Sequence, residues 1–186
     1  MRVPLSEAFE THTETVGILI ADDETDTCEL FAEFARAHGM RVATAYDGRA
    51  AISALERSPK EFSIVVTDLQ MPGADGFEVL RAARAINPDC HVVMITGYAT
   101  IDTAVRAVRE GAYDYLAKPF ALGQLEVVLR RIRDRIALET ENRELVRQIA
   151  ERAPTVTPRE VMDRFDLIDS RLSTIERLLR DRVLLK

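Results

Sequence analysis

Five short segments with the length of a β-strand alternate with stretches in which apolar residues recur every three or four positions. The strand-like segments are 16–21, 41–45, 63–67, 91–95 and 113–117. Gly39, Asn87-Pro88 and Gly111 end helical stretches between them. Strands that are apolar on both faces and alternate with helices form a parallel sheet covered on both sides. The pattern therefore predicts a doubly wound α/β domain.

The composition indicates one folded domain with a shorter appendage. Apolar residues make up 47% of the 186 positions, which excludes disordered and collagen-like chains. No apolar stretch reaches the roughly 18 residues of a membrane span, and the first residues lack a signal peptide, so we expect a cytoplasmic protein. Cys28 and Cys90 have no metal-site spacing, and we expect both to be buried as small apolar residues.

Charge is divided unevenly along the chain. Residues 1–121 carry 11 basic and 19 acidic side chains, whereas residues 122–186 carry 14 basic and 12 acidic ones. A nucleic-acid interface needs a clearly basic face, and neither part has that balance. Clustered aspartates in the acidic part instead indicate a divalent cation.

The predicted strands end in residues that carry chemistry. Ligands of doubly wound sheets bind outside the carboxyl ends of the strands. These ends are Asp22-Asp23, Asp68, Thr96 and Lys118-Pro119. The fold would thus gather three carboxylates, a hydroxyl and an ammonium at one edge of the sheet.

This set of groups is suited to phosphoryl transfer. Three carboxylates repel one another unless they hold a hard cation, and Mg²⁺ is the natural candidate. Because Mg²⁺ uses one or two carboxylates and keeps several waters, a third carboxylate remains available as a nucleophile. Lys118 would balance the charge of the phosphoryl oxygens, and the Thr96 hydroxyl would donate a hydrogen bond to one of them. The product would be an acyl phosphate.

The chain resembles the receiver domain of two-component response regulators over residues 15–135. The resemblance lies in the segments ILIADDE, VVTDLQMPGADGFEVL, VVMITGYAT and GAYDYLAKPF. It implies a flavodoxin-like, five-stranded parallel sheet in the order 2-1-3-4-5 and a cis Lys118-Pro119 bond. The wording of the last two segments is most similar to receivers of the nitrogen-regulation type.

The resemblance also implies a role for each site residue. Asp68 would be the phosphoacceptor, and a sensor histidine kinase or a phosphotransfer protein would donate the phosphoryl group. The metal ligands would be Asp23, Asp22 through water, Asp68 and the backbone carbonyl of Gln70. Thr96 and Lys118 would bind the phosphoryl group, and Thr96 and Tyr115 would be the switch residues. The chain would be a regulator that assists only its own phosphorylation and dephosphorylation.

Two kinds of alternative remain open. Taken singly, Asp22 or Asp68 could be a helix N-cap, Lys118 a solvated charge, Thr96 a turn residue and Tyr115 a half-buried aromatic. The rival enzyme is a Mg²⁺-dependent phosphatase with an aspartate nucleophile and an acid two residues later. Gln70 stands at that later position, so the general acid is missing.

Apolar residues continue at heptad spacing beyond the receiver-like part. Leu122, Leu125, Leu129, Ile132 and Ile136 form one run, and Leu138, Asn142, Leu145 and Ile149 form a second. With Leu138 and Leu145 at d positions, Asn142 lies at an a position, where Asn selects a dimer register. We therefore predict a coiled coil over 136–152 that extends the last receiver helix and forms a parallel homodimer.

A second amphipathic helix is predicted over 157–185. Thr157, Pro158 and Glu160 have the order of a helix start, and a heptad run follows from Val161 to Leu179. This helix could extend the dimer, fold back or bind a downstream protein target. TPREVM resembles the start of a helix-turn-helix domain, but too few residues follow it. DNA binding, by this chain or a longer regulator of which it is a fragment, is the alternative function.

Overall fold

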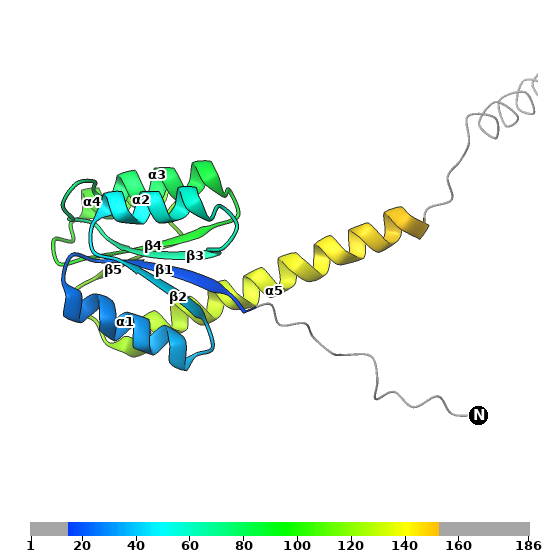
Figure 1. Cartoon of the computed structure of the whole chain (residues 1–186), viewed down its shortest axis with the longest axis horizontal. Helices are drawn as coiled ribbons and strands as arrows, with labels where there is room; N and C mark the ends of the chain where they lie inside the picture. The colour runs from blue at the N-terminus through cyan, green and yellow to red at the C-terminus, as the bar shows by residue number, and fades with distance from the viewer. Residues whose placement is uncertain (1–14, 153–186) are drawn as a thin grey trace, which may run out of the picture. The chain divides into compact units, whose positions relative to one another are not determined.

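The computed structural model describes residues 15–152, which form a three-layer α/β domain and a long last helix (Figure 1). The strands are β1 Gly17–Ala21, β2 Arg41–Ala45, β3 Ile64–Asp68, β4 His91–Thr96 and β5 Asp114–Ala117. The helices are α1 Thr25–Ala37, α2 Gly48–Arg57, α3 Gly76–Ile86, α4 Ile101–Glu110 and α5 Leu122–Arg152. All strand pairs are parallel in the order β2-β1-β3-β4-β5. The predicted fold class is confirmed.

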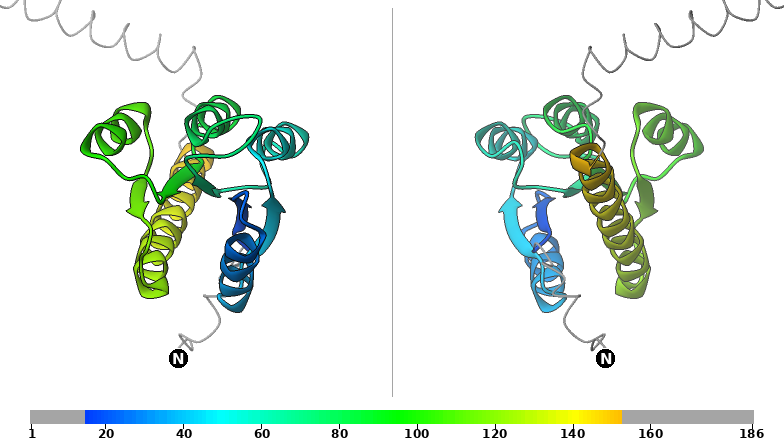
Figure 2. Two further views of the ribbon diagram at one scale, coloured as in Figure 1. Left: turned by 90° about the vertical axis from the view of Figure 1, so that its left-hand side faces the viewer. Right: turned by 90° about the vertical axis from the view of Figure 1, so that its right-hand side faces the viewer.

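Helices cover both faces of the sheet. Figure 2 shows α2, α3 and α4 on one side and α1 with the start of α5 on the other. Side chains alternate accordingly, because Leu19 and Val65 pack toward the first group while Ile18 and Ile20 pack toward the second. Burying a Leu, Ile or Val side chain stabilises the fold by about 1.5 to 3 kcal/mol. The two cores therefore fix the sheet and the positions of its strand ends.

Two strands run one residue further than the sequence pattern predicted. Asp68 is the last residue of β3 and is paired with Ile95, and Thr96 is the last residue of β4 and is paired with Ala117. Apolar patterning marks buried hydrophobic residues, so the predicted ranges stop one residue before Asp68 and Thr96, which were expected at the strand ends and belong to the backbone ladder. The sheet itself consequently positions both side chains.

The two cysteines are buried among apolar residues, as expected. Burial raises the pKa of the Cys28 thiol to about 11 and that of the Cys90 thiol to about 12. Both thiols are therefore protonated at neutral pH, and neither has the thiolate character that a nucleophile or a metal ligand needs.

Helix α5 continues without a break to Arg152, as the heptad runs predicted. The chain divides after Ala137 into two compact units, of which the first holds the whole sheet. Beyond that point Leu138, Leu145, Val146 and Ile149 are exposed. The coiled coil stays a prediction, and the predicted helix over 157–185 lies outside the described residues. Between residues 15 and 152, no helix has the length and apolar character needed to span a membrane.

Candidate functional site

Three carboxylates meet where β1 and β3 end. These strands are neighbours in the sheet, with Ala21 paired to Thr67, so the residues that follow them are brought side by side. One oxygen each from Asp22, Asp23 and Asp68 lies within 4.8 Å of the others. Asp22 and Asp68 are buried, whereas Asp23 is exposed. The predicted acidic cluster is therefore present.

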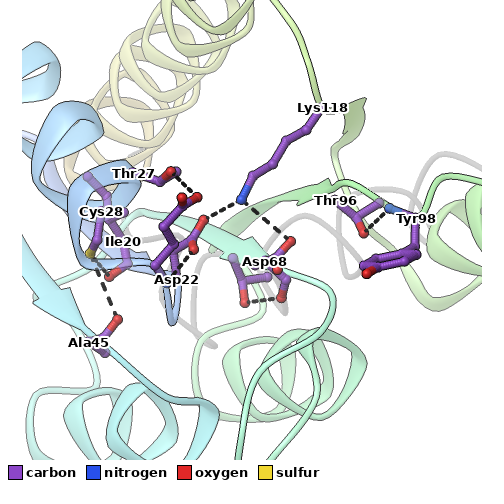
Figure 3. A network of polar contacts seen from close by, with 11 residues as sticks. Ile20, Asp22, Thr27, Cys28, Ala45, Asp68, Thr96, Tyr98 and Lys118 are labelled. Atoms are coloured by element: carbon purple, nitrogen blue, oxygen red, sulfur yellow. Dashed lines mark hydrogen bonds and ion pairs between the residues drawn. The ribbon is translucent and has the colours of Figure 1, made fainter.

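Lys118 reaches into this cluster from the end of β5 (Figure 3). Its Nζ donates a hydrogen bond of 2.7 Å to Asp22 Oδ2 and lies 4.0 Å from Asp68 Oδ1. The backbone holds the residue in place, because Lys118 N donates to the Thr96 carbonyl at 2.7 Å. The Lys118-Pro119 bond is cis, as the resemblance implied. The explanation of Lys118 as a solvated charge is wrong.

Asp68 has an environment unlike that of a surface carboxylate. Only 9% of the residue is exposed, and its Oδ1 accepts no hydrogen bond from the described part of the chain. Burial raises the pKa of the Asp68 carboxyl; Lys118 opposes this rise, and the charges of Asp22 and Asp23 add to it. The ionised carboxylate thus lacks a full set of favourable partners, which an incoming cation would supply.

The cluster lines an open cavity of about 750 Å³. Its lining includes the three aspartates, Lys118, and Gln70 and Met71 from the loop between β3 and α3. It also includes Tyr98 and Arg106, two residues that the sequence did not single out. Arg106 belongs to α4, and its Cζ lies 3.7 Å from the centroid of the Phe77 ring. The sequence around Arg106 looks like that of any exposed arginine on a helix. Its place at the cavity is seen only once α4 packs against α3.

The N-cap explanation of the aspartates does not hold. Helix α3 is capped by Asp75, whose Oδ1 accepts from Glu78 N at 2.8 Å while Glu78 Oε2 accepts from Asp75 N at 2.9 Å. Helix α1 begins after Glu24, and Asp22 Oδ1 accepts from Glu24 N at 2.9 Å in the preceding turn. Neither aspartate therefore caps a helix in the described part of the chain, although Asp22 also stabilises the turn before α1.

Thr96 and Tyr115 are not among the residues that line the cavity, although Thr96 directly precedes Gly97, which does line it. Thr96 is fully buried, and its Oγ1 accepts a hydrogen bond of 3.0 Å from Tyr98 N. Tyr115 is half-buried, and its hydroxyl shares a 2.8 Å hydrogen bond with Thr103 Oγ1 at the start of α4. The turn role of Thr96 and the half-buried state of Tyr115 are both confirmed. Neither observation conflicts with a further role in switching.

The donor set fits a hard divalent cation. Carboxylate and carbonyl oxygens are the preferred ligands of Mg²⁺ and Ca²⁺. The described site offers three carboxylates, one of which, Asp68, has a buried oxygen, Oδ1, that accepts no hydrogen bond. The adjacent Lys118 ammonium would complement the oxygens of a bound anion such as a phosphoryl group. The arrangement can therefore hold a cation and a phosphoryl group together.

Comparison with known proteins assigns the family. The sequence model described as "Response regulator receiver domain" matches residues 18–130. The chain belongs to the receiver domain family. The resemblance found in the sequence is confirmed, and residues 18–130 of this receiver contain every proposed site residue.

Curated relatives of this receiver are transcriptional regulators. It is 38% identical over 117 residues to the transcriptional regulatory protein ZraR of Klebsiella oxytoca. The matched region covers 62% of this chain and 26% of ZraR. It is 34% identical over 152 residues to the C4-dicarboxylate transport transcriptional regulatory protein DctD of Rhizobium meliloti. That matched region covers 80% of this chain and 32% of DctD. The chain thus spans about a quarter to a third of these relatives.

Solved receiver structures match the described fold. A response regulator receiver domain protein from Clostridium thermocellum is 28% identical with a TM-score of 0.62, and the match covers 66% of this chain and 98% of that one. A Burkholderia pseudomallei response regulator with a phosphorylated aspartic acid, a calcium ion and citrate is 26% identical with a TM-score of 0.56. That match covers 76% of this chain and 88% of the other.

Proposed function

We propose that this receiver accepts a phosphoryl group on Asp68 from a sensor histidine kinase or a phosphotransfer protein. The observation that carries the proposal is the buried Asp68 carboxylate, which lines the cavity beside Asp22 and Asp23 and lies 4.0 Å from the Lys118 ammonium. The phosphorylated aspartic acid and calcium ion of the Burkholderia pseudomallei regulator support it. The receiver acts as a regulator in the cytoplasm and turns over no small substrate.

In the proposed reaction, an Asp68 carboxylate oxygen attacks the phosphorus of a phosphohistidine. The new bond joins that oxygen to phosphorus, and the bond from phosphorus to the imidazole nitrogen breaks with its electron pair. Lys118 donates a hydrogen bond to a phosphoryl oxygen and so stabilises the charge of the transferred group. Asp22, Asp23, Asp68 and the Gln70 carbonyl would hold Mg²⁺, which supplies positive charge to the phosphoryl oxygens when bound.

Dependence on Mg²⁺ tests the proposed function. With acetyl phosphate as donor, intact-mass spectrometry should show one added phosphoryl group in Mg²⁺ and none after chelation. Asp23→Asn should slow labelling by about two orders of magnitude, because metal contact stabilises phosphoryl oxygens by several kcal/mol. Asp26→Asn is the matched control, since Asp26 is an exposed acid of α1 outside the cluster. Labelling that is unaffected by chelation would contradict the proposal.

The proposed switch uses Thr96 and Tyr115. Thr96 Oγ1 accepts from Tyr98 N, so its own proton is available to a phosphoryl oxygen on Asp68. Movement of Thr96 toward that oxygen opens space for Tyr115, which then leaves Thr103 on α4. The phosphoryl group thereby favours a second arrangement of the surface formed by α4 and β5.

Loss of the Thr96 hydroxyl should separate phosphorylation from the response. Thr96→Ala should still be labelled on Asp68, yet the phosphorylation-dependent change in hydrogen exchange of α4 and β5 should fall to a small fraction of the wild-type change. Thr96→Ser keeps the hydroxyl and should restore most of the response. A full response in Thr96→Ala would show that the coupling takes another route.

The proposed output is assembly through helices. Exposed apolar residues of α5 beyond Ala137 support a homodimer, and a downstream protein target is a further possible partner. The names of the curated relatives favour a second candidate, in which this receiver controls DNA-bound transcription as part of a longer regulator. Binding of the intact chain to duplex DNA, measured across a salt series, tests whether this chain itself contacts DNA, because direct binding must weaken steeply with salt.

A further inference from the structure

The loop between β3 and α3, residues 69–75, is pressed against the first turn of α2. Gly48 N donates a 3.2 Å hydrogen bond to the Pro72 carbonyl, which also accepts from Ala74 N at 2.9 Å. A Cβ atom on Gly48 would overlap the Ala74 carbonyl oxygen and lie 2.6 Å from its carbonyl carbon. Only a residue without a side chain allows this approach.

The need for glycine at position 48 is one of space and not of backbone conformation. The glycines with positive φ are Gly39, Gly73 and Gly111, so Gly48 is not required by a positive φ angle. An Ala in a helix is intrinsically better than Gly by about 1 kcal/mol. Gly48 therefore lowers the intrinsic stability of α2 but allows α2 to pack closely against the loop.

The remaining contacts hold the loop from both ends. Gly76 N donates to the Leu69 carbonyl at 2.9 Å, and a Cβ atom on Gly76 would overlap the Asp68 carbonyl oxygen. On the α2 side, Asp47 Oδ1 accepts from Ala50 N at 2.7 Å and fixes the first turn that carries Gly48. The loop segment between these two anchors includes Gln70, which lines the cavity.

We propose that Gly48 is a positioning residue for the cation site. The first turn of α2 sets the position of the Gln70 carbonyl relative to the three carboxylates, an inference that rests on the function proposed above. Gly48 contacts neither the cation nor the phosphoryl group. A side chain at position 48 would push Ala74 and Pro72 away from α2 and carry Gln70 with them, so binding weakens although every ligand is still present.

Gly17 provides a matched control for the collision itself. It lies at the amino end of β1, the edge of the sheet remote from the aspartates. A Cβ atom there would overlap the Glu61 carbonyl oxygen and lie 3.0 Å from its carbon, a backbone collision of the same kind. Gly17→Ala thus imposes a similar steric conflict without touching the loop. Both substitutions should lower the thermal unfolding midpoint.

Calorimetric titration of the full-length variants with Mg²⁺ alone is the test. Because supporting groups around a metal site typically change affinity by about 10- to 100-fold, Gly48→Ala should weaken binding by at least about tenfold. Gly17→Ala should bind as the wild type does. Equal affinities of Gly48→Ala and the wild type, or equal weakening in both variants, would overturn the positioning role.

A metal-free measurement separates this inference from the proposed function. Gly48→Ala should shift the amide NMR resonances of residues 69–75, and Gly17→Ala should not. A wild type that binds no Mg²⁺ would contradict the proposed function, whereas unmoved loop resonances in Gly48→Ala would contradict the positioning role.

Arg49→Ala serves if Gly48→Ala does not fold. The Arg49 Cγ lies 3.2 Å from the ideal Cβ position of Gly73, so this side chain covers the loop from the same turn of α2. Arg49→Ala should bind Mg²⁺ more weakly than Arg57→Ala, a control at the far end of α2. Equal affinities of these two variants would also overturn the proposal.

Discussion

Asp68→Asn should accept no phosphoryl group from either acetyl phosphate or a phosphohistidine donor. The amide is a far weaker nucleophile than the carboxylate and cannot form the acyl phosphate. Asp23→Asn is the informative comparison, because it removes a carboxylate from the same cluster and leaves the proposed nucleophile in place. It should be labelled slowly to completion, whereas Asp68→Asn stays unlabelled. Undiminished labelling of Asp68→Asn would disprove the assignment.

Loss of folding does not account for the expected inactivity of Asp68→Asn. Burial holds the pKa of the Asp68 carboxyl above its usual value in the folded state, so its ionised form costs folding stability at neutral pH. Replacement by a neutral amide removes that cost and the repulsion from Asp22 and Asp23. The unfolding midpoint of metal-free Asp68→Asn should therefore equal or exceed that of the wild type, as measured by circular dichroism.

Leu145→Glu should convert the proposed dimer into a monomer. Leu138, Leu145 and Ile149 are 61%, 48% and 68% exposed on α5, as expected of a seam that a second helix covers. A glutamate at a d position removes about 1.5 to 3 kcal/mol of apolar burial from each of two chains. This loss corresponds to a dissociation constant at least about a hundredfold higher. Sedimentation equilibrium measures the mass directly.

Thr140→Glu is the control for Leu145→Glu. In the predicted heptad it lies on the outer side of α5, so the same charge is added away from the seam. It should remain dimeric, and a chain ending at Arg135 should be monomeric. A monomeric wild type, with and without phosphorylation, would show that the heptads of α5 make no dimer. A dimeric Leu145→Glu would show that another surface makes it.

Much of the fold and the acidic cluster could be predicted from the sequence, for a physical reason. Buried parallel strands need apolar residues on both faces, and this requirement makes the central strands β1, β3 and β4 visible in the chain. Since parallel strands share one carboxyl edge, the residues after them must converge, as Asp22, Asp23 and Asp68 do. The family resemblance then gave those residues their expected roles.

Contacts between elements distant in sequence could not be predicted in this way. The hydrogen bond between Lys118 and Asp22 joins residues 96 positions apart, and no local pattern encodes it. Gly48 reads as an ordinary helix start, and its close approach to Ala74 exists only once α2 packs beside the loop. Arg106 likewise reaches the cavity only because α4 lies against Phe77 of α3. Such features depend on packing, which periodicity does not record.

The most direct measurement locates the phosphoryl group on the wild-type protein, without any substitution. Borohydride reduces an acyl phosphate to an alcohol and releases phosphate, so a phosphorylated aspartate becomes homoserine while an ordinary aspartate is unchanged. After reaction with acetyl phosphate and Mg²⁺, reduction and peptide mass mapping should place homoserine at position 68 alone. Homoserine at position 22 or 23, or a phosphorylated protein with no homoserine at 68, would contradict Asp68 as the phosphoacceptor.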